Sequence, residues 1–95
     1  MFSRLIYKWF TQKRCKLKFR KDSVWENSNW YEISDSTLMK YLKDLQNDYT
    51  FTILKMDLTS YDCTVVIRCN QADKYKIFTD FCEKAGKYIE HVRIY

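Results

Sequence analysis

The sequence predicts a single α+β domain in which a four-stranded antiparallel sheet carries two helices on one face. Three observations support this prediction. Four segments have the alternation or the β-branched and aromatic content of strands, and two have the apolar spacing of helices. These segments follow one another in the order β, α, β, β, α, β. The length of 95 residues fits one domain, residues 1–95, and an apolar content of 46% supplies its core.

Ahead of these six segments, residues 1–12 have the spacing of a short basic amphipathic helix. Its apolar stripe consists of Phe2, Leu5, Ile6, Trp9 and Phe10. We expect this stripe to pack on the domain and complete its core. The alternative is insertion into a membrane surface or into the groove of a partner.

The first strand, residues 14–20, alternates strictly between cations and apolar residues. Its cations are Arg14, Lys16, Lys18 and Arg20. The apolar residues between them are Cys15, Leu17 and Phe19. Because successive side chains of a strand point to opposite faces, one face is entirely basic and the other enters the core. The basic face is either a solvated outer surface or a functional one.

A turn-rich connection, residues 22–34, follows the first strand. Asn27, Ser28 and Asn29 mark a turn, and the segment from Trp30 to Ile33 is a candidate short strand of a hairpin. This segment is also a candidate for an additional strand. Trp25 flanks the same turn as Trp30, so the two tryptophans either cover the core or form an exposed contact loop.

Two segments have helical apolar spacing. The first is capped by Ser34 or Asp35, ends near Asn47 and has the stripe Leu38, Tyr41, Leu42 and Leu45. The second is capped by Asn70 and has the stripe Tyr75, Phe78, Phe81, Cys82 and Ala85. Gly86, the only glycine, is expected to end the second helix with a positive φ.

The other three strands are predicted from β-branched and aromatic content. They run from Tyr49 to Leu58, from Cys63 to Cys69 and from His91 to Tyr95. Their inward-facing residues are predicted to include Cys63, Val65, Ile67, Cys69, Val92 and Ile94.

The four cysteines form no CxxC pair, and each lies at an apolar position of the pattern. We therefore expect free, buried thiols and a reducing, cytoplasmic location. With one histidine and no ligands at zinc spacing, neither a metal nor another cofactor is expected. No segment approaches the roughly 20 apolar residues that a membrane span needs.

The element order over residues 13–95 resembles the ferredoxin-like (βαββαβ) fold. This resemblance implies that the strand at 14–20 lies between those at 91–95 and 63–69. The open face of the sheet would then present cations and aromatic or imidazole groups from three strands, with no acid from those strands among them. These residues are Arg14, Lys16, Lys18, Arg20, Arg68, His91, Arg93 and Tyr95.

RNA-recognition motifs share this topology and bind through the same face. Their signature on the third strand requires a glycine and exposed aromatic residues, whereas residues 61–69 have Val65, Val66 and Ile67 in the corresponding stretch. The signature is absent, so we expect binding to the phosphate backbone with little sequence preference.

An enzyme is not expected. A chain with one glycine has no glycine-rich phosphate loop, on which the acylphosphatase version of this fold relies. Cys15, Cys63 and Cys82 are predicted to point into the core, away from His91 as a base. Glu26 and Glu32 lack the defined spacing of a catalytic carboxylate pair.

Charge is segregated along the chain. Residues 1–21 carry eight Lys and Arg and no acid, whereas residues 22–95 carry the other nine against all 12 Asp and Glu. Such segregation indicates that the chain binds a polyanion or an acidic surface of a partner. The predicted function is a small binding protein that contacts nucleic acid, RNA in particular. The predicted contact residues are Arg14, Lys16, Lys18, Arg20, Arg68, Arg93 and Tyr95.

A protein partner is the alternative. The small size and the Lys-, Asn- and Tyr-rich composition without proline resemble accessory proteins of bacteriophages. Many of those take over a host enzyme, repress a defence system or neutralise a toxin. The resemblance implies a regulator or inhibitor whose basic segment docks on an acidic surface of a host protein.

Overall fold

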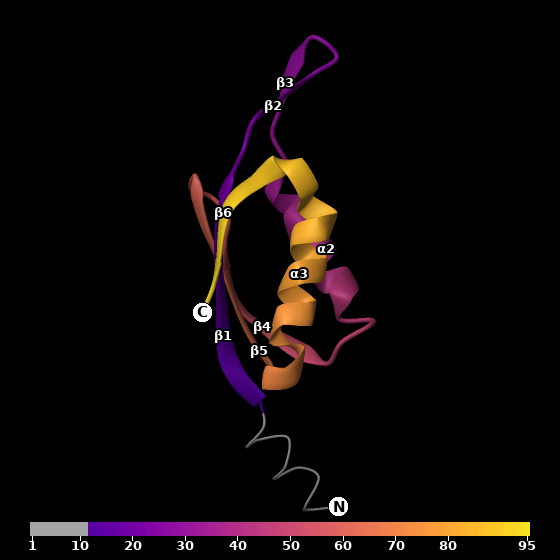
Figure 1. The fold of residues 1–95 in the computed structure, drawn as a ribbon, viewed down its shortest axis with the longest axis vertical. Helices are drawn as coiled ribbons and strands as arrows, with labels where there is room; N and C mark the ends of the chain where they lie inside the picture. The colour runs from indigo at the N-terminus through magenta and orange to yellow at the C-terminus, as the bar shows by residue number, and fades with distance from the viewer. Residues whose placement is uncertain (1–11) are drawn as a thin grey trace, which may run out of the picture.

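The computed structural model describes residues 12–95, which form an α+β arrangement of one four-stranded antiparallel sheet and two helices (Figure 1). The predicted helix of residues 1–12 lies outside this range except for Gln12, which begins the first strand. Within residues 12–95, no helix is long and apolar enough to cross a membrane.

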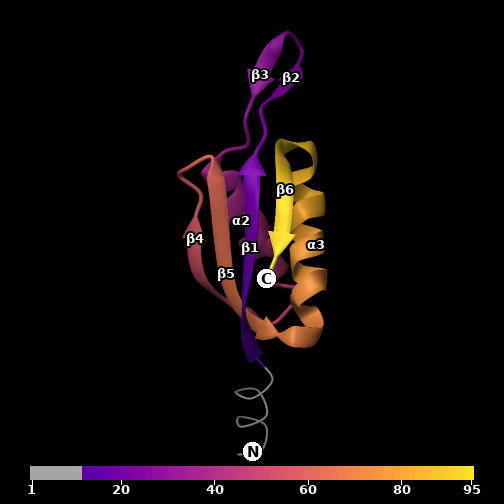
Figure 2. The ribbon, with the colours of Figure 1, turned by 60° about the vertical axis from the view of Figure 1, so that its left-hand side comes forward.

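The main sheet has the strand order β4-β5-β1-β6 (Figure 2). Its strands are β1 (Gln12–Lys21), β4 (Phe51–Asp57), β5 (Asp62–Asn70) and β6 (Ile89–Ile94). Each neighbouring pair is antiparallel. The predicted place of the first strand, between the third and the last strands of the βαββαβ series, is confirmed. β1 and β5 are therefore the two central strands, and both present one face to solvent.

Helices α2 (Asp35–Leu45) and α3 (Lys74–Ala85) cover the same face of the sheet (Figure 1). Ser34 caps α2, because its hydroxyl accepts a hydrogen bond from the main-chain N–H of Thr37 at 3.2 Å. Asn70 instead caps the 3₁₀ turn η1 (Gln71–Asp73) that precedes α3, accepting from Ala72 N. A second 3₁₀ turn, η2 (Gly86–Tyr88), joins α3 to β6.

The core lies between the sheet and these two helices. β1 contributes Cys15, Leu17 and Phe19, each at most 2% exposed, as the alternation predicts. The ring of Phe19 packs against that of Phe81 of α3 with 5.7 Å between centroids. Burial of such side chains contributes about 1.5–3 kcal/mol each, so this layer holds much of the stability of a small domain.

Two residues predicted to face inward do not. Tyr75 is 62% exposed in the first turn of α3, and Ile77 takes the buried position instead. Val92 is 41% exposed because β6 is an edge strand that carries a bulge. Lys18 pairs with Arg93 and Arg20 with Glu90, which leaves two residues of β6 opposite one residue of β1.

A hairpin of β2 (Val24–Glu26) and β3 (Asn29–Tyr31) forms its own two-stranded sheet and projects from the body of the domain (Figures 1 and 2). Asn27 and Ser28 both have positive φ, as a two-residue type I′ turn requires. The predicted hairpin is confirmed, but it adds no strand to the main sheet. Trp25 and Trp30 pair across it at 58% and 68% exposure, so of the two alternatives for these tryptophans the structure agrees with an exposed loop and not with a cover over the core.

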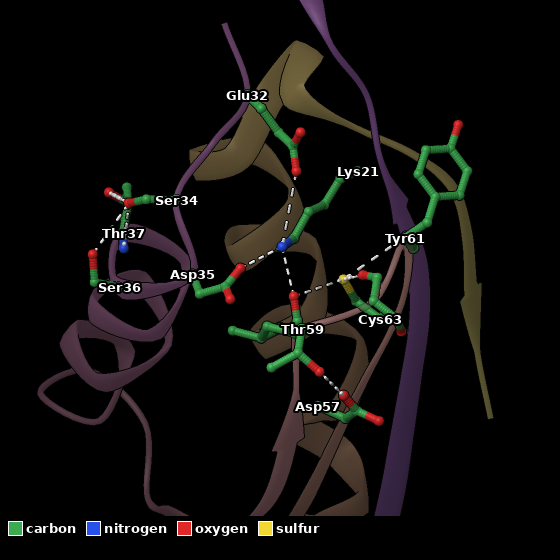
Figure 3. Close-up of polar contacts among 12 residues, drawn as sticks. Lys21, Glu32, Ser34, Asp35, Ser36, Thr37, Asp57, Thr59, Tyr61 and Cys63 are labelled. Carbon is green, nitrogen blue, oxygen red and sulfur yellow. Dashed lines mark hydrogen bonds and ion pairs between the residues drawn. The ribbon is translucent and has the colours of Figure 1, made fainter.

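Lys21, counted with the basic segment in the sequence, is 7% exposed and turns toward the helices (Figure 3). Its ammonium donates to the carboxylate of Asp35, in the first turn of α2, and to the carbonyl of Leu58 at 2.5 Å. A carboxylate oxygen of Glu32 lies 4.0 Å away. Lys21 therefore joins the end of β1 to the start of α2 and the end of β4, and it is not part of the open face.

Gly86 ends α3 with φ +56° and ψ −131°, which confirms its predicted positive φ. Apart from its two chain neighbours and the backbone of its own turn, a methyl group there would meet no atom of residues 12–95 within 4 Å, so substitution strains only the backbone. We expect Gly86→Ala to lower the free energy of unfolding by about 1–2 kcal/mol. Urea denaturation measures this change. An unchanged midpoint would contradict the backbone argument.

All four cysteines, which lie within the described residues, are free thiols, and three of them are buried. Sγ of Cys69 lies 3.7 Å from Sγ of Cys15. Burial, followed by the neighbouring Cys15, raises the pKa of Cys69 to about 12. Burial also raises the pKa values of Cys63 and Cys82. These thiols are therefore the opposite of the activated thiolates that cysteine nucleophiles require.

We expect native protein at pH 7.5 to react slowly with a maleimide at every cysteine, with the half-buried Cys82 reacting first.

The raised pKa values of the thiols also predict a pH dependence of stability. Above about pH 8.5 the unfolded chain loses thiol protons that the folded chain keeps, so the unfolding free energy falls as pH rises. Mass spectrometry of the labelled protein and urea midpoints between pH 8 and 10 measure both effects. Rapid labelling of two native thiols would contradict this expectation.

Candidate functional site: the open face of the sheet

The open face is the side of the sheet away from α2 and α3, and β1 crosses its centre. Arg14, Lys16, Lys18 and Arg20 are all exposed there, whereas the residues between them are buried. The predicted segregation of cations and apolar residues on β1 is therefore present. Arg68 of β5 and Arg93 and Tyr95 at the end of β6 are exposed as well.

The strand register brings like charges together on this face. Arg14 lies directly opposite Arg68 of β5, and Lys18 lies directly opposite Arg93 of β6. Within residues 12–95 none of these four side chains makes an ion pair, and neither does Lys16. Like charges at directly opposite positions of a sheet repel and destabilise it, so the face has electrostatic energy that a bound anion would relieve.

Lys16 occupies the middle of the face. It is opposite Val66 of β5, and main-chain hydrogen bonds in both directions join it to Tyr95. Val66 is only 3% exposed although it belongs to the open face. Lys55 of β4 is its other register partner, so the aliphatic stems of two lysines are placed to cover it.

Arg20 differs from the other cations. Its Nε donates to Oδ1 of Asp62 at 2.8 Å, and Glu90 lies opposite it on β6. The expectation that no acid of the three strands joins the basic face is therefore wrong. β5 and β6 each begin before the predicted strand, at Asp62 and Ile89, and the added residues include these acids.

Tyr61 completes an acidic and aromatic group around Arg20. The guanidinium carbon of Arg20 lies 5.8 Å from the centre of the Tyr61 ring, and the Tyr61 hydroxyl donates to Glu90 at 3.3 Å. The negative charge of Glu90 raises the pKa of Tyr61. Arg20 is thus neutralised within the protein. On β1, β5 and β6, the cations of the face that make no ion pair within residues 12–95 are Arg14, Lys16, Lys18, Arg68 and Arg93.

A hollow of about 500 Å³ lies on this face where β5, β1 and the bulged part of β6 meet. Its lining residues are Lys18, Phe19, Arg20, Asp62, Cys63, Thr64, His91, Arg93 and Tyr95. Phe19 and Cys63 are 2% and 1% exposed, so they contribute almost no accessible surface to the hollow. The ammonium of Lys18 lies 5.9 Å from the centre of the Tyr95 ring.

His91 lies in the bulge with φ +53°, an uncommon conformation for a residue other than glycine. Such backbone strain is of order 1–3 kcal/mol and is found at binding sites more often than elsewhere. The bulge sets Glu90 opposite Arg20 and Arg93 opposite Lys18, which fixes the two sides of the hollow.

Sequence reasoning missed several residues of this face. Lys55 and Asp57 reach it because a register shift between Ile53 and Lys55 moves the second half of β4 by one position. Thr64, which lies opposite Lys18, belongs to this face as well and is not among the predicted contact residues. Within residues 12–95 no group of three or more His, Cys, Asp or Glu residues is arranged to hold a metal ion.

Comparison with known proteins adds no assignment to this geometry. No protein-family model matches the chain, and no curated protein is significantly similar to it.

Proposed function

We propose that this chain is a small non-enzymatic protein that binds nucleic acid, RNA in particular, across the open face of its sheet. The observation that carries the proposal is that two pairs of like charges are register partners, Arg14 with Arg68 and Lys18 with Arg93. A phosphate backbone that crosses β1 from its β5 side to its β6 side would pass between the members of each pair and replace repulsion with attraction. We also assign the domain to the ferredoxin-like fold, because its strand order agrees with that family.

The residues of the central strands argue for weak sequence selectivity. The outward positions of β1 and β5 hold Arg, Lys, Gln, Asn, Asp, Thr and Val side chains, and none of them is aromatic. RNA-binding sheets that read sequence stack bases on aromatic residues at such positions. Here the affinity would come from contacts with phosphates, so oligonucleotides of different sequence should bind with similar affinity.

Fluorescence anisotropy with labelled single-stranded RNA of about 12 nucleotides tests the proposal. If four or five phosphates contact the unpaired cations, log affinity should fall with log salt at a slope of about −3 to −3.5. Uridine-rich and mixed sequences should bind within a few-fold of each other. Absence of RNA binding at about 50 mM salt would rule the proposal out.

A second candidate function, binding to an acidic surface of a host protein as a phage-type regulator or inhibitor, is favoured by the β2–β3 hairpin. Trp25 and Trp30 meet edge to face with 5.2 Å between ring centroids and remain largely exposed. Exposed tryptophans are typical anchors of protein interfaces. Trp25→Ala together with Trp30→Ala should leave RNA affinity unchanged if the open face binds RNA, and should weaken binding to a protein target.

A further inference from the structure

We propose that the hollow on the open face holds one nucleotide of the bound single strand, with its base on the Tyr95 ring and its phosphate between Lys18 and Arg93. The inference rests on the proposed function and adds a defined subsite to it. The nucleic-acid backbone would then continue from this nucleotide along β1, where it would contact the remaining unpaired cations.

The size and position of the hollow support this assignment. A volume of about 500 Å³ lies within the range of roughly 300–1,000 Å³ that is usual for small-molecule sites. The hollow opens on the basic face, because its lining residues with exposed side chains belong to that face, and Phe19 and Cys63 stay buried beneath them. A nucleotide can therefore enter it from the strand that the face binds without any rearrangement of the core.

The phosphate position follows from the charges. Lys18 and Arg93 face each other across β1 and β6, and neither makes an ion pair within residues 12–95. Arg20, the third cation of the hollow, is already bound to Asp62. A phosphate is therefore attracted to Lys18 and Arg93 and is kept from the Arg20 side by the Asp62 carboxylate.

The base position follows from the aromatic ring. Tyr95 is 54% exposed, and its main chain is fixed to β1 by hydrogen bonds with Lys16 at 2.8 and 3.3 Å. Its ring lies beside Lys18, so a base on the ring brings the attached phosphate close to the ammonium. Thr64 and Asp62 line the opposite side with oxygen atoms that can accept hydrogen bonds from amino groups of a base or from a ribose hydroxyl.

The experiment compares Tyr95→Ala and Tyr95→Phe with Tyr75→Ala, measured by anisotropy with the labelled RNA and with inorganic polyphosphate as a competitor. Tyr75 is a matched control, because it is 62% exposed, has the ammonium of Lys74 at 5.1 Å from its ring, and lies on α3 in the helical layer. Both positions are exposed, so the melting temperatures of all three variants should stay close to that of the wild type.

We expect Tyr95→Ala to weaken RNA binding about tenfold, the usual effect of losing one base-stacking residue, with an unchanged salt slope. Tyr95→Phe keeps a stacking ring and should bind as the wild type does. Lys18→Ala and Arg93→Ala should each reduce the magnitude of the salt slope by about 0.7. Affinity for polyphosphate, which has no bases, should be the same in Tyr95→Ala and in the wild type.

Equal RNA affinities of Tyr95→Ala and Tyr75→Ala, in a protein whose wild type binds RNA, would overturn the nucleotide subsite and leave the proposed function intact. An equal loss of RNA and polyphosphate affinity in Tyr95→Ala would overturn it too, because stacking would then not be the cause. A wild type that binds no RNA would overturn the subsite together with the proposed function.

Discussion

Replacing Lys16, Lys18 and Arg68 with glutamate should lower the affinity for single-stranded RNA at least 100-fold at about 50 mM salt. The three side chains lie on adjacent strands at the centre of the open face and make no ion pair within residues 12–95. Each substitution removes one phosphate contact and adds a repulsive charge at the same place. Anisotropy titrations at several salt concentrations measure both the affinity and the loss of salt dependence.

The fold should survive this triple substitution. Exposed substitutions usually change the unfolding free energy by no more than about 0.5 kcal/mol. Arg68→Glu also places an acid opposite Arg14, which replaces a repulsive cross-strand pair with an attractive one. We therefore expect a melting temperature equal to or slightly above that of the wild type.

A variant with the same change in net charge on the helical side is the control. Lys40 lies on α2, and Lys74 and Lys76 lie on α3, away from the open face. Changing these three to glutamate should reduce RNA affinity only slightly. If both triple variants lost affinity equally, net charge alone would explain the binding and the open face would not be the site. If neither variant bound RNA less well than the wild type, the open face would not be the site either.

Lys21→Ala should lower the free energy of unfolding by about 2–4 kcal/mol and leave RNA affinity unchanged. The substitution removes hydrogen bonds from a buried ammonium to the carboxylate of Asp35 and to the carbonyl of Leu58. Hydrogen bonds that involve a charged group contribute about 1.5–3 kcal/mol each, and the Asp35 side chain is 44% exposed, which weakens its share. For a domain of this size the melting temperature should fall by on the order of 10 °C or more.

Lys18→Ala is the matched comparison for Lys21→Ala, because both residues belong to β1 and lie three positions apart. Lys18→Ala should reduce RNA affinity and keep the melting temperature, the reverse of the result for Lys21→Ala. Urea denaturation and RNA titration of the two variants separate the roles. A loss of RNA affinity in a folded Lys21→Ala protein would show that Lys21 belongs to the binding surface after all.

Local pattern was sufficient to predict the four strands of the main sheet, the two helices and the two sides of β1. The alternation of residues 14–20 determines which side chains are buried, because a strand has a period of two and its apolar face must be covered. The helical stripe of α2 and the positive φ of Gly86 are also local properties. The burial of Ile77 in place of Tyr75 on α3 is not a local property. It depends on how the start of that helix is placed against the sheet.

The charge distribution of the binding face was decided only by tertiary structure. The count of eight cations and no acid in residues 1–21 gives no sign that Lys21 is buried or that Arg20 meets Asp62, 42 positions away. The bulge at His91 and the register shift in β4 set Arg93 opposite Lys18 and bring Lys55 to the open face. Strand register is a long-range property, and a shift of one residue moves a side chain to the other face of the sheet. Residue types along the chain thus determined the sheet and its basic strand, whereas the partners of each cation, and the hollow between them, depend on how distant strands are aligned.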